Sequence, residues 1–223
     1  MTFLTDVQKR LEALLQPNSE YEEFLTAIKN ANSPWEIVGI LGSTFAIRET
    51  AIKGTLNKSC DFEGKMYVGE GTVIKKSTLE GPIYIGKNCR IGPDAYVRPY
   101  TIIGDNCHIG HGTEMKNAII LSHSNAAHRN FIADSIVGEH CNLGNKTGLP
   151  NLRLDEKVII PRNGNNEKEP YTRRKYGAII EDGCKFACGI DLIPGQYVTG
   201  YQEAYRDPKE TVFRSRKIEV KTH

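Results

Sequence analysis

Two cationic residues are spaced for binding an anion. Arg98, Lys116 and Asp134 follow one another at intervals of eighteen residues. If the chain forms coils of that length, their side chains stack on one edge, separated by the inter-strand spacing of about 4.8 Å. Two cations so close repel each other unless an anion lies between them. A phosphate would accept a bidentate hydrogen bond from Arg98, and Lys116 would add a point charge. The spacing predicts a phosphate site; the alternative is a solvated charge ladder that Asp134 partly neutralises.

His128 could act as a general base beside this site, because the imidazole pKa lies near the working pH of most enzymes. The alternative is an ordinary surface histidine. His123 and His128 are five residues apart, a spacing similar to that of zinc-dependent hexapeptide-repeat carbonic anhydrases. Those enzymes need a third histidine, and we expect His108 and His111 to be out of register for that role. The sequence therefore predicts no metal at this site.

A repeat of six residues predicts the elements that position these side chains. Apolar residues recur at every sixth position, and glycine often follows them. A period of six fits neither an α-helix nor a lone strand. It fits a parallel β-helix in which three short strands close a triangular coil of about eighteen residues. The sequence predicts an all-β solenoid, a left-handed parallel β-helix of hexapeptide repeats with an N-terminal α-helical appendage. The residues expected to point into its interior are Ile85, Ile91, Val97, Ile103, Ile109, Met115, Leu121, Ala127 and Ala133.

Within this repeat, the four residues singled out above stand where a corner glycine is expected. Glycine permits the tight turn between two strands of a coil. Arg98, Lys116, His128 and Asp134 each directly follow an apolar residue of the predicted series. The chemistry is therefore expected at the corners of the solenoid.

The repeat divides the chain into three predicted parts. Residues 51–200 form the β-helix, and a turn-rich loop at 152–176 protrudes from one corner. Residues 1–50 form the helical segment, because their apolar residues have helical spacing. The charged tail at 201–223 is expected to cover the open end of the last coil.

The last predicted helix of the N-terminal segment has a clear start. Ser33 is expected as the N-cap, Pro34 as the first helical residue, and Glu36 as the partner that closes a capping box. The apolar face of this helix is expected to pack on the first coil.

Composition excludes several classes of protein. The 39% hydrophobic content and the net charge of +2 exclude wholesale disorder and give no strongly basic face for nucleic acid. The apolar runs are too short to span a bilayer, and the N-terminus lacks the layout of a secretory signal. The sequence predicts a soluble cytoplasmic protein with no nucleic-acid or membrane partner.

Several motifs together resemble a known enzyme family. The runs at 91–99, 112–118 and 127–134 are similar to the acetyltransferase half of the bifunctional enzyme that makes UDP-N-acetylglucosamine. Pro34-Trp35-Glu36, Glu80-Gly81-Pro82 and the run at 173–180 resemble its archaeal-type relatives. The resemblance covers roughly residues 34–200, so the domain is expected to stand alone, without the nucleotidyltransferase domain that normally precedes it.

The resemblance implies a homotrimer with active sites between neighbouring prisms, in which acetyl-CoA acetylates an amino-sugar 1-phosphate. By position, His128 would be the base, and the substrate would be bound by Arg98, Lys116, Phe131, Asn142 and Lys175. Acetyl-CoA would be contacted by Asn145, Asn151, Leu152 and Cys188. The mechanism implied is orientation plus proton removal, with no covalent enzyme intermediate.

Two departures from the family pattern favour a different function. Phe131 replaces a tyrosine, which removes a hydroxyl contact to the substrate, and Lys146 stands in a turn where glycines are expected and acetyl-CoA approaches. The alternative is a catalytically silent trimeric β-helix that binds a sugar phosphate or nucleotide sugar, or that scaffolds a separate nucleotidyltransferase. The intact Arg98, Lys116 and His128 favour the enzyme.

Overall fold

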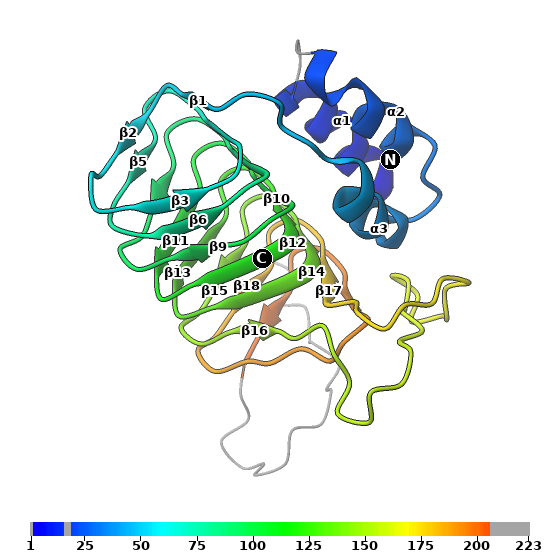
Figure 1. The fold of residues 1–223 in the computed structure, drawn as a ribbon. Helices are drawn as coiled ribbons and strands as arrows, with labels where there is room; N and C mark the ends of the chain where they lie inside the picture. The colour runs from blue at the N-terminus through cyan, green and yellow to red at the C-terminus, as the bar shows by residue number, and fades with distance from the viewer. Residues whose placement is uncertain (1, 16–18, 206–223) are drawn as a thin grey trace.

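The computed structural model is a parallel β-helix with α-helices packed along one side (Figure 1). It describes residues 2–15 and 19–205. The named strands of this part pair in parallel, one coil on the next. The predicted fold class, a left-handed parallel β-helix with N-terminal helices, is confirmed. The predicted covering of the last coil by the tail falls, from residue 206 onward, outside the described residues.

The coils have three faces, each a stack of short strands. Face 1 contains β1 (Ala51–Ile52), β4 (Met66–Val68), β7 (Ile83–Ile85), β10 (Thr101–Ile103), β12 (Glu114–Ile120), β14 (Phe131–Val137), β17 (Ala178–Ile180) and β19 (Gln196–Val198). Face 2 contains β2 (Thr55–Leu56), β5 (Val73–Ile74), β8 (Arg90–Ile91), β11 (His108–His111), β13 (Asn125–His128), β15 (Asn142–Leu143), β18 (Lys185–Phe186) and β20 (Glu203–Ala204). Face 3 contains β3 (Asp61–Glu63), β6 (Thr78–Glu80), β9 (Tyr96–Val97), the first halves of β12 and β14, and β16 (Gly148–Leu149).

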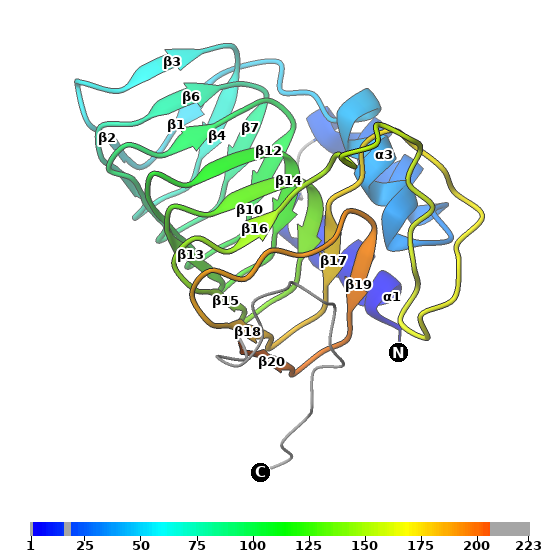
Figure 2. The ribbon, with the colours of Figure 1, turned by 90° about the horizontal axis from the view of Figure 1, so that it is seen from below.

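Three corners join these faces. The chain passes from face 1 to face 2 at the first corner, from face 2 to face 3 at the second, and from face 3 back to face 1 at the third. Strands β12 and β14 run through the third corner without a break. A long connection leaves this corner after β16, projects beside the helices, and returns to β17 (Figure 2).

The predicted inward series is correct as far as Met115 and wrong beyond it. Lys116 pairs with Ala133, seventeen residues later, so the coil is one residue shorter than expected. The interior of the prism is therefore filled by Ile120, Ala126 and Ile132, each one residue before its predicted counterpart. Leu121 instead packs in the cluster beneath the helices.

The helices cover face 1. They are α1 (Phe3–Leu15), the short η1 (Ser19–Tyr21), α2 (Glu22–Lys29) and α3 (Pro34–Thr44). The outward residues of face 1 are apolar, and Ile102, Ile119, Ile136 and Ile179 are buried beneath the helices. Full burial stabilises each of these side chains by about 1.5–3 kcal/mol. The molecule thus has two hydrophobic cores, one inside the prism and one between face 1 and the helices.

Helix α3 begins as predicted but packs elsewhere. The Ser33 hydroxyl caps it by accepting a hydrogen bond from the Trp35 N–H. Glu36 does not close the predicted capping box, because its carboxylate accepts from the N–H of Asn32, one residue earlier. The helix lies against β12 and β14 of the middle coils, not on the first coil, because the buried isoleucines of face 1 lie there.

No helix in the described ranges has the length and apolar character needed to cross a membrane.

Candidate functional site

Arg98 and Lys116 lie side by side at the third corner, as predicted from their spacing. Met115 pairs with Val97, which places the next residue of each strand, Lys116 and Arg98, in register. Arg98 Nη1 donates to Glu114 Oε1 over 3.0 Å, and the guanidinium lies 5.6 Å from the Tyr96 ring centroid. Arg98 Nε is buried without a hydrogen-bond partner. An unpaired buried donor on a cation costs free energy, and the Arg98 side chain, which is 33% exposed, is open to an anion at this edge.

The third member of the predicted stack, Asp134, does not join it. The residue beside Lys116 in the next coil is Ala133, because this coil has seventeen residues. Asp134 is buried one position further on, where its carboxylate accepts hydrogen bonds from Asn117 and Asn151. It therefore does not neutralise the two cations. Lys116 is half-buried, and within residues 2–15 and 19–205 its ammonium makes no hydrogen bond or ion pair.

His128 lies at the second corner, across face 3 from the two cations. It is exposed and ends β13. Its partner in the coil above is His111, so the expectation that His111 is out of register was wrong. In register, Ala127 corresponds to Gly110 of the coil above, and His128 corresponds to His111. His128 therefore does not replace a corner glycine, contrary to the expectation. The half-buried Phe131 begins the strand across face 3 and pairs with Glu114. A small molecule lying over Phe131 would therefore reach from His128 to the Arg98–Lys116 edge.

The other two residues predicted to bind the substrate are Lys175, next to the third corner, and Asn142, on face 2. Lys175 is exposed and directly precedes Tyr176, whose N–H donates to the Asn151 carbonyl at the third corner. It therefore returns from the long connection to the edge that carries Arg98 and Lys116. Asn142 is exposed on face 2, where it pairs with Asn125 above it and with Lys185 below it.

The residues assigned to acetyl-CoA flank the strand β16. Asn145 and the exposed Cys188 lie at the second corner of successive coils, since the Gly189 N–H donates to the Asn145 carbonyl. Asn151 and the exposed Leu152 lie at the third corner, directly after β16. A side-chain carbon at Gly189 would have no atom within 4 Å. This open surface fits an extended ligand that passes along the second corner.

The electrostatic surroundings of the site come from faces 2 and 3. Burial, helped by the nearby Arg90 and His128, lowers the pKa of His108 on face 2. On face 3, a hydrogen bond to Glu80 raises the pKa of the Tyr96 phenol. Among the described residues, no group of three or more His, Cys, Asp or Glu side chains is placed to hold a metal ion. The absence of a catalytic metal stays a prediction.

Sequence reasoning missed the two residues that surround Arg98. Glu114 pairs with its guanidinium, and the Tyr96 ring lies beside it. Both belong to the outward ladder of face 3. Period-two alternation was the available signal, because Glu114 and Tyr96 each lie two residues before one of the predicted cations and so share their face.

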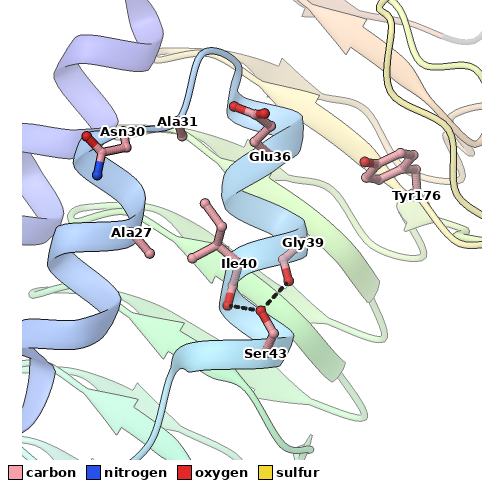
Figure 3. A pocket seen from close by; sticks show the side chains of 8 residues that line it. All are labelled: Ala27, Asn30, Ala31, Glu36, Gly39, Ile40, Ser43 and Tyr176. Atoms are coloured by element: carbon pink, nitrogen blue, oxygen red, sulfur yellow. Dashed lines mark hydrogen bonds between the residues drawn. The ribbon is translucent and has the colours of Figure 1, made fainter.

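Two hollows of the described chain lie away from these residues. One of about 350 Å³ opens between α2, α3 and Tyr176 (Figure 3). A second, of about 540 Å³, lies between η1, α2 and the residues after α3. Neither is lined by a predicted site residue. The candidate site is therefore separate from both of these hollows.

The fold and its corner residues define a hexapeptide-repeat β-helix protein. A family model described as "GMPPB C-terminal domain" matches residues 79–163. This range includes Arg98, Lys116 and His128.

Sequence comparison with curated proteins shows which members of this class the chain is similar to. The chain is 37% identical over 163 residues to the bifunctional protein GlmU of Methanocaldococcus jannaschii. The aligned segment covers 73% of this chain and 40% of that protein. It is 33% identical over 114 residues to a bifunctional sugar-1-phosphate nucleotidylyltransferase/acetyltransferase of Sulfurisphaera tokodaii, covering 51% of this chain and 28% of that protein. The chain spans less than half the length of these relatives. The solved structure of a UDP-N-acetylglucosamine acyltransferase aligns with 71% of this chain and 70% of its own at 14% identity, and its TM-score of 0.28 supports no inference. The predicted resemblance to the GlmU acetyltransferase domain is confirmed.

Proposed function

We propose that this chain is a CoA-dependent N-acetyltransferase that acts on an amino-sugar 1-phosphate in nucleotide-sugar biosynthesis. The observation that carries the proposal is the pair of cations at the third corner. Arg98 has a buried Nε without a partner, and Lys116 lies beside it without an ion pair in the described part of the chain. A phosphate monoester would accept hydrogen bonds from both. The GlmU resemblance supports an amino sugar as the rest of the acceptor.

In this proposal the sugar lies over Phe131 with its amine toward His128. The neutral imidazole accepts a proton from the amine as the nitrogen attacks the acyl carbonyl. The new N–C bond replaces the C–S bond, and the CoA thiolate leaves and takes up the proton from the imidazolium to become the thiol. Asn142 and Lys175 would hold the sugar. Asn145, Asn151, Leu152 and Cys188 would hold acetyl-CoA, which supplies the activated acetyl group.

The proposed assembly is a homotrimer in the cytoplasm. Helices cover face 1, which leaves faces 2 and 3 for contacts between chains. Apart from Asn142 on face 2, the site residues lie along the edges of face 3, so a neighbouring prism against this face would enclose them. A separate nucleotidyltransferase is the proposed partner in the pathway.

The test is thiol release from acetyl-CoA with glucosamine 1-phosphate, and in parallel with galactosamine 1-phosphate. We expect turnover on one of them, and a loss of about 10²–10⁴-fold in His128→Ala if the imidazole is the base. His111→Ala is the matched control, since His111 is the exposed neighbour in the coil above. An unchanged rate in His128→Ala would remove this residue from the mechanism.

The second candidate is a silent trimer that keeps only the sugar-phosphate site. Phe131 supports it, and so does the exposed Lys146, whose backbone N–H donates to the His128 carbonyl over 3.0 Å. Thermal stabilisation by the sugar phosphate but not by CoA, without turnover, would favour this candidate.

A further inference from the structure

Three polar side chains, one per coil, form a ladder at the third corner. Asp134 lies in the middle and is 6% exposed. Its Oδ1 accepts from Asn117 Nδ2 over 2.7 Å, and its Oδ2 accepts from Asn151 Nδ2 over 2.5 Å. Both carboxylate oxygens are thus bound by neutral amides. A buried carboxylate is costly unless it is hydrogen-bonded, so the presence of an aspartate in this Asn–Asp–Asn ladder calls for a reason.

The ladder fixes the backbone from which Lys116 projects. Asn117 and Asp134 have φ values of 44° and 47°. Few residues besides glycine adopt this left-handed conformation, and Asn and Asp are enriched among them. Lys116 directly precedes Asn117, so the direction of its side chain depends on the conformation that the ladder holds.

The same ladder receives the returning end of the long connection. The Gly177 N–H donates to the Asp134 carbonyl over 2.9 Å, and the Tyr176 N–H donates to the Asn151 carbonyl over 3.2 Å. Lys175 directly precedes Tyr176. The backbone of the ladder therefore anchors both Lys116, assigned to the phosphate, and Lys175, assigned to the sugar.

Helix α3 supports the ladder from outside. Asn117 Nδ2 also donates to the Val38 carbonyl over 3.3 Å. Its Oδ1 is buried without a partner and faces Gly42, where an added Cβ would lie 3.0 Å away. The other orientation of this amide would set its oxygen against the Asp134 carboxylate, so Asp134 dictates how Asn117 meets the helix.

We propose that Asp134 is a positioning residue for the phosphate edge: through Asn117 it holds Lys116 beside Arg98, and through Asn151 it anchors Lys175 further along the same edge, with α3 as the support. This inference rests on the proposed function, because it takes the phosphate of the acceptor to bind at this edge. Asp134 itself does not touch the substrate.

Two substitutions disturb the ladder in different ways. In Asp134→Asn an amide group replaces one oxygen, so one of the two asparagines loses its acceptor. In Gly42→Ala a methyl group presses on the buried Asn117 oxygen, while helix propensity improves. Gly39→Ala in the same helix is the matched control, because its Cβ would meet only the end of the exposed, flexible Arg173 side chain, 3.1 Å away.

The affinity of the full chain for glucosamine 1-phosphate is measured by calorimetry, and KM is measured for each substrate. We expect Asp134→Asn and Gly42→Ala to bind the sugar phosphate at least about tenfold more weakly. The KM for acetyl-CoA should stay the same, and Gly39→Ala should match the wild type. A merely structural role would instead lower the melting temperature without this selective change. Because Gly42→Ala favours the helix, it keeps the test decisive if Asp134→Asn does not fold.

Wild-type affinity for the sugar phosphate in Gly42→Ala, or in a folded Asp134→Asn, would overturn this inference alone. Failure of the wild-type chain to bind glucosamine 1-phosphate or galactosamine 1-phosphate would overturn it together with the proposed function.

Discussion

Two basic residues beside His128 adopt a backbone conformation that suits glycine. Arg129 and Lys146 have φ values of 51° and 61°, whereas the same position in flanking coils is Gly112 or Gly189. A side chain in this conformation costs about 1–2 kcal/mol. Local stability therefore does not account for either residue. At the second corner, two successive coils thus carry residue types that the backbone geometry does not favour, and such departures cluster at functional sites.

His108 makes the stability of the folded chain depend on pH. Its pKa in the folded chain lies below the ordinary 6.5 because of burial and the neighbouring Arg90 and His128. The unfolded chain therefore binds this proton more readily. The group leaves stability unchanged above pH 6.5 and lowers it as the pH falls from 6.5 toward the folded-state pKa.

We expect His108→Gln to lose less stability than the wild type between about pH 7.5 and about pH 5.5. The free energies of unfolding are measured with urea at both pH values. Equal losses in the two proteins would show that His108 does not contribute to this dependence.

Among the elements, α3 and the long connection hold each other in place. Trp35 is fully buried. Its indole N–H donates to the Arg162 carbonyl over 2.8 Å, and its ring lies edge-on to Tyr176 at 5.1 Å. This contact joins two segments that are far apart in sequence.

Trp35→Phe should cost about 1–2 kcal/mol, because it leaves the Arg162 carbonyl without its donor. It should also speed proteolytic cleavage within residues 152–176. Tyr84→Phe is the control, since the Tyr84 hydroxyl donates to the Leu14 carbonyl in α1 over 2.8 Å. The control should lose similar stability without faster cleavage there. Equal cleavage rates in the two variants would show that Trp35 does not hold the connection.

The elements also show where sequence reasoning succeeds and where it stops. The repeat predicted the fold and the pairing of Arg98 with Lys116, because between Ile83 and Met115 successive coils pair at the expected interval of eighteen residues. It missed the shorter coil because Ile119, Ile120 and Leu121 are all apolar and fit either phase. Which of the three faces the interior is decided by pairing with β10 and β14. The displacement of Asp134 from the predicted stack follows from this one missing residue.

At the scale of the whole molecule, the covered face limits how chains can assemble. Faces 2 and 3 remain for contact, and the candidate site runs along the edges of face 3. We expect light scattering to give the mass of three chains of 24.9 kDa, about 75 kDa. A single-chain mass at the concentration where the enzyme is active would contradict a site formed between prisms.

The docking of the helices has a consequence for biosynthesis. Arg10 in α1 donates to both carboxylate oxygens of Asp182, over 2.7 and 2.8 Å, and Trp35 reaches Arg162. Helix α1 and helix α3 thus make these two contacts only after most of the solenoid has been synthesised. Until then the helices can pack only on one another and on the earlier coils of face 1, so their docking is completed late in synthesis.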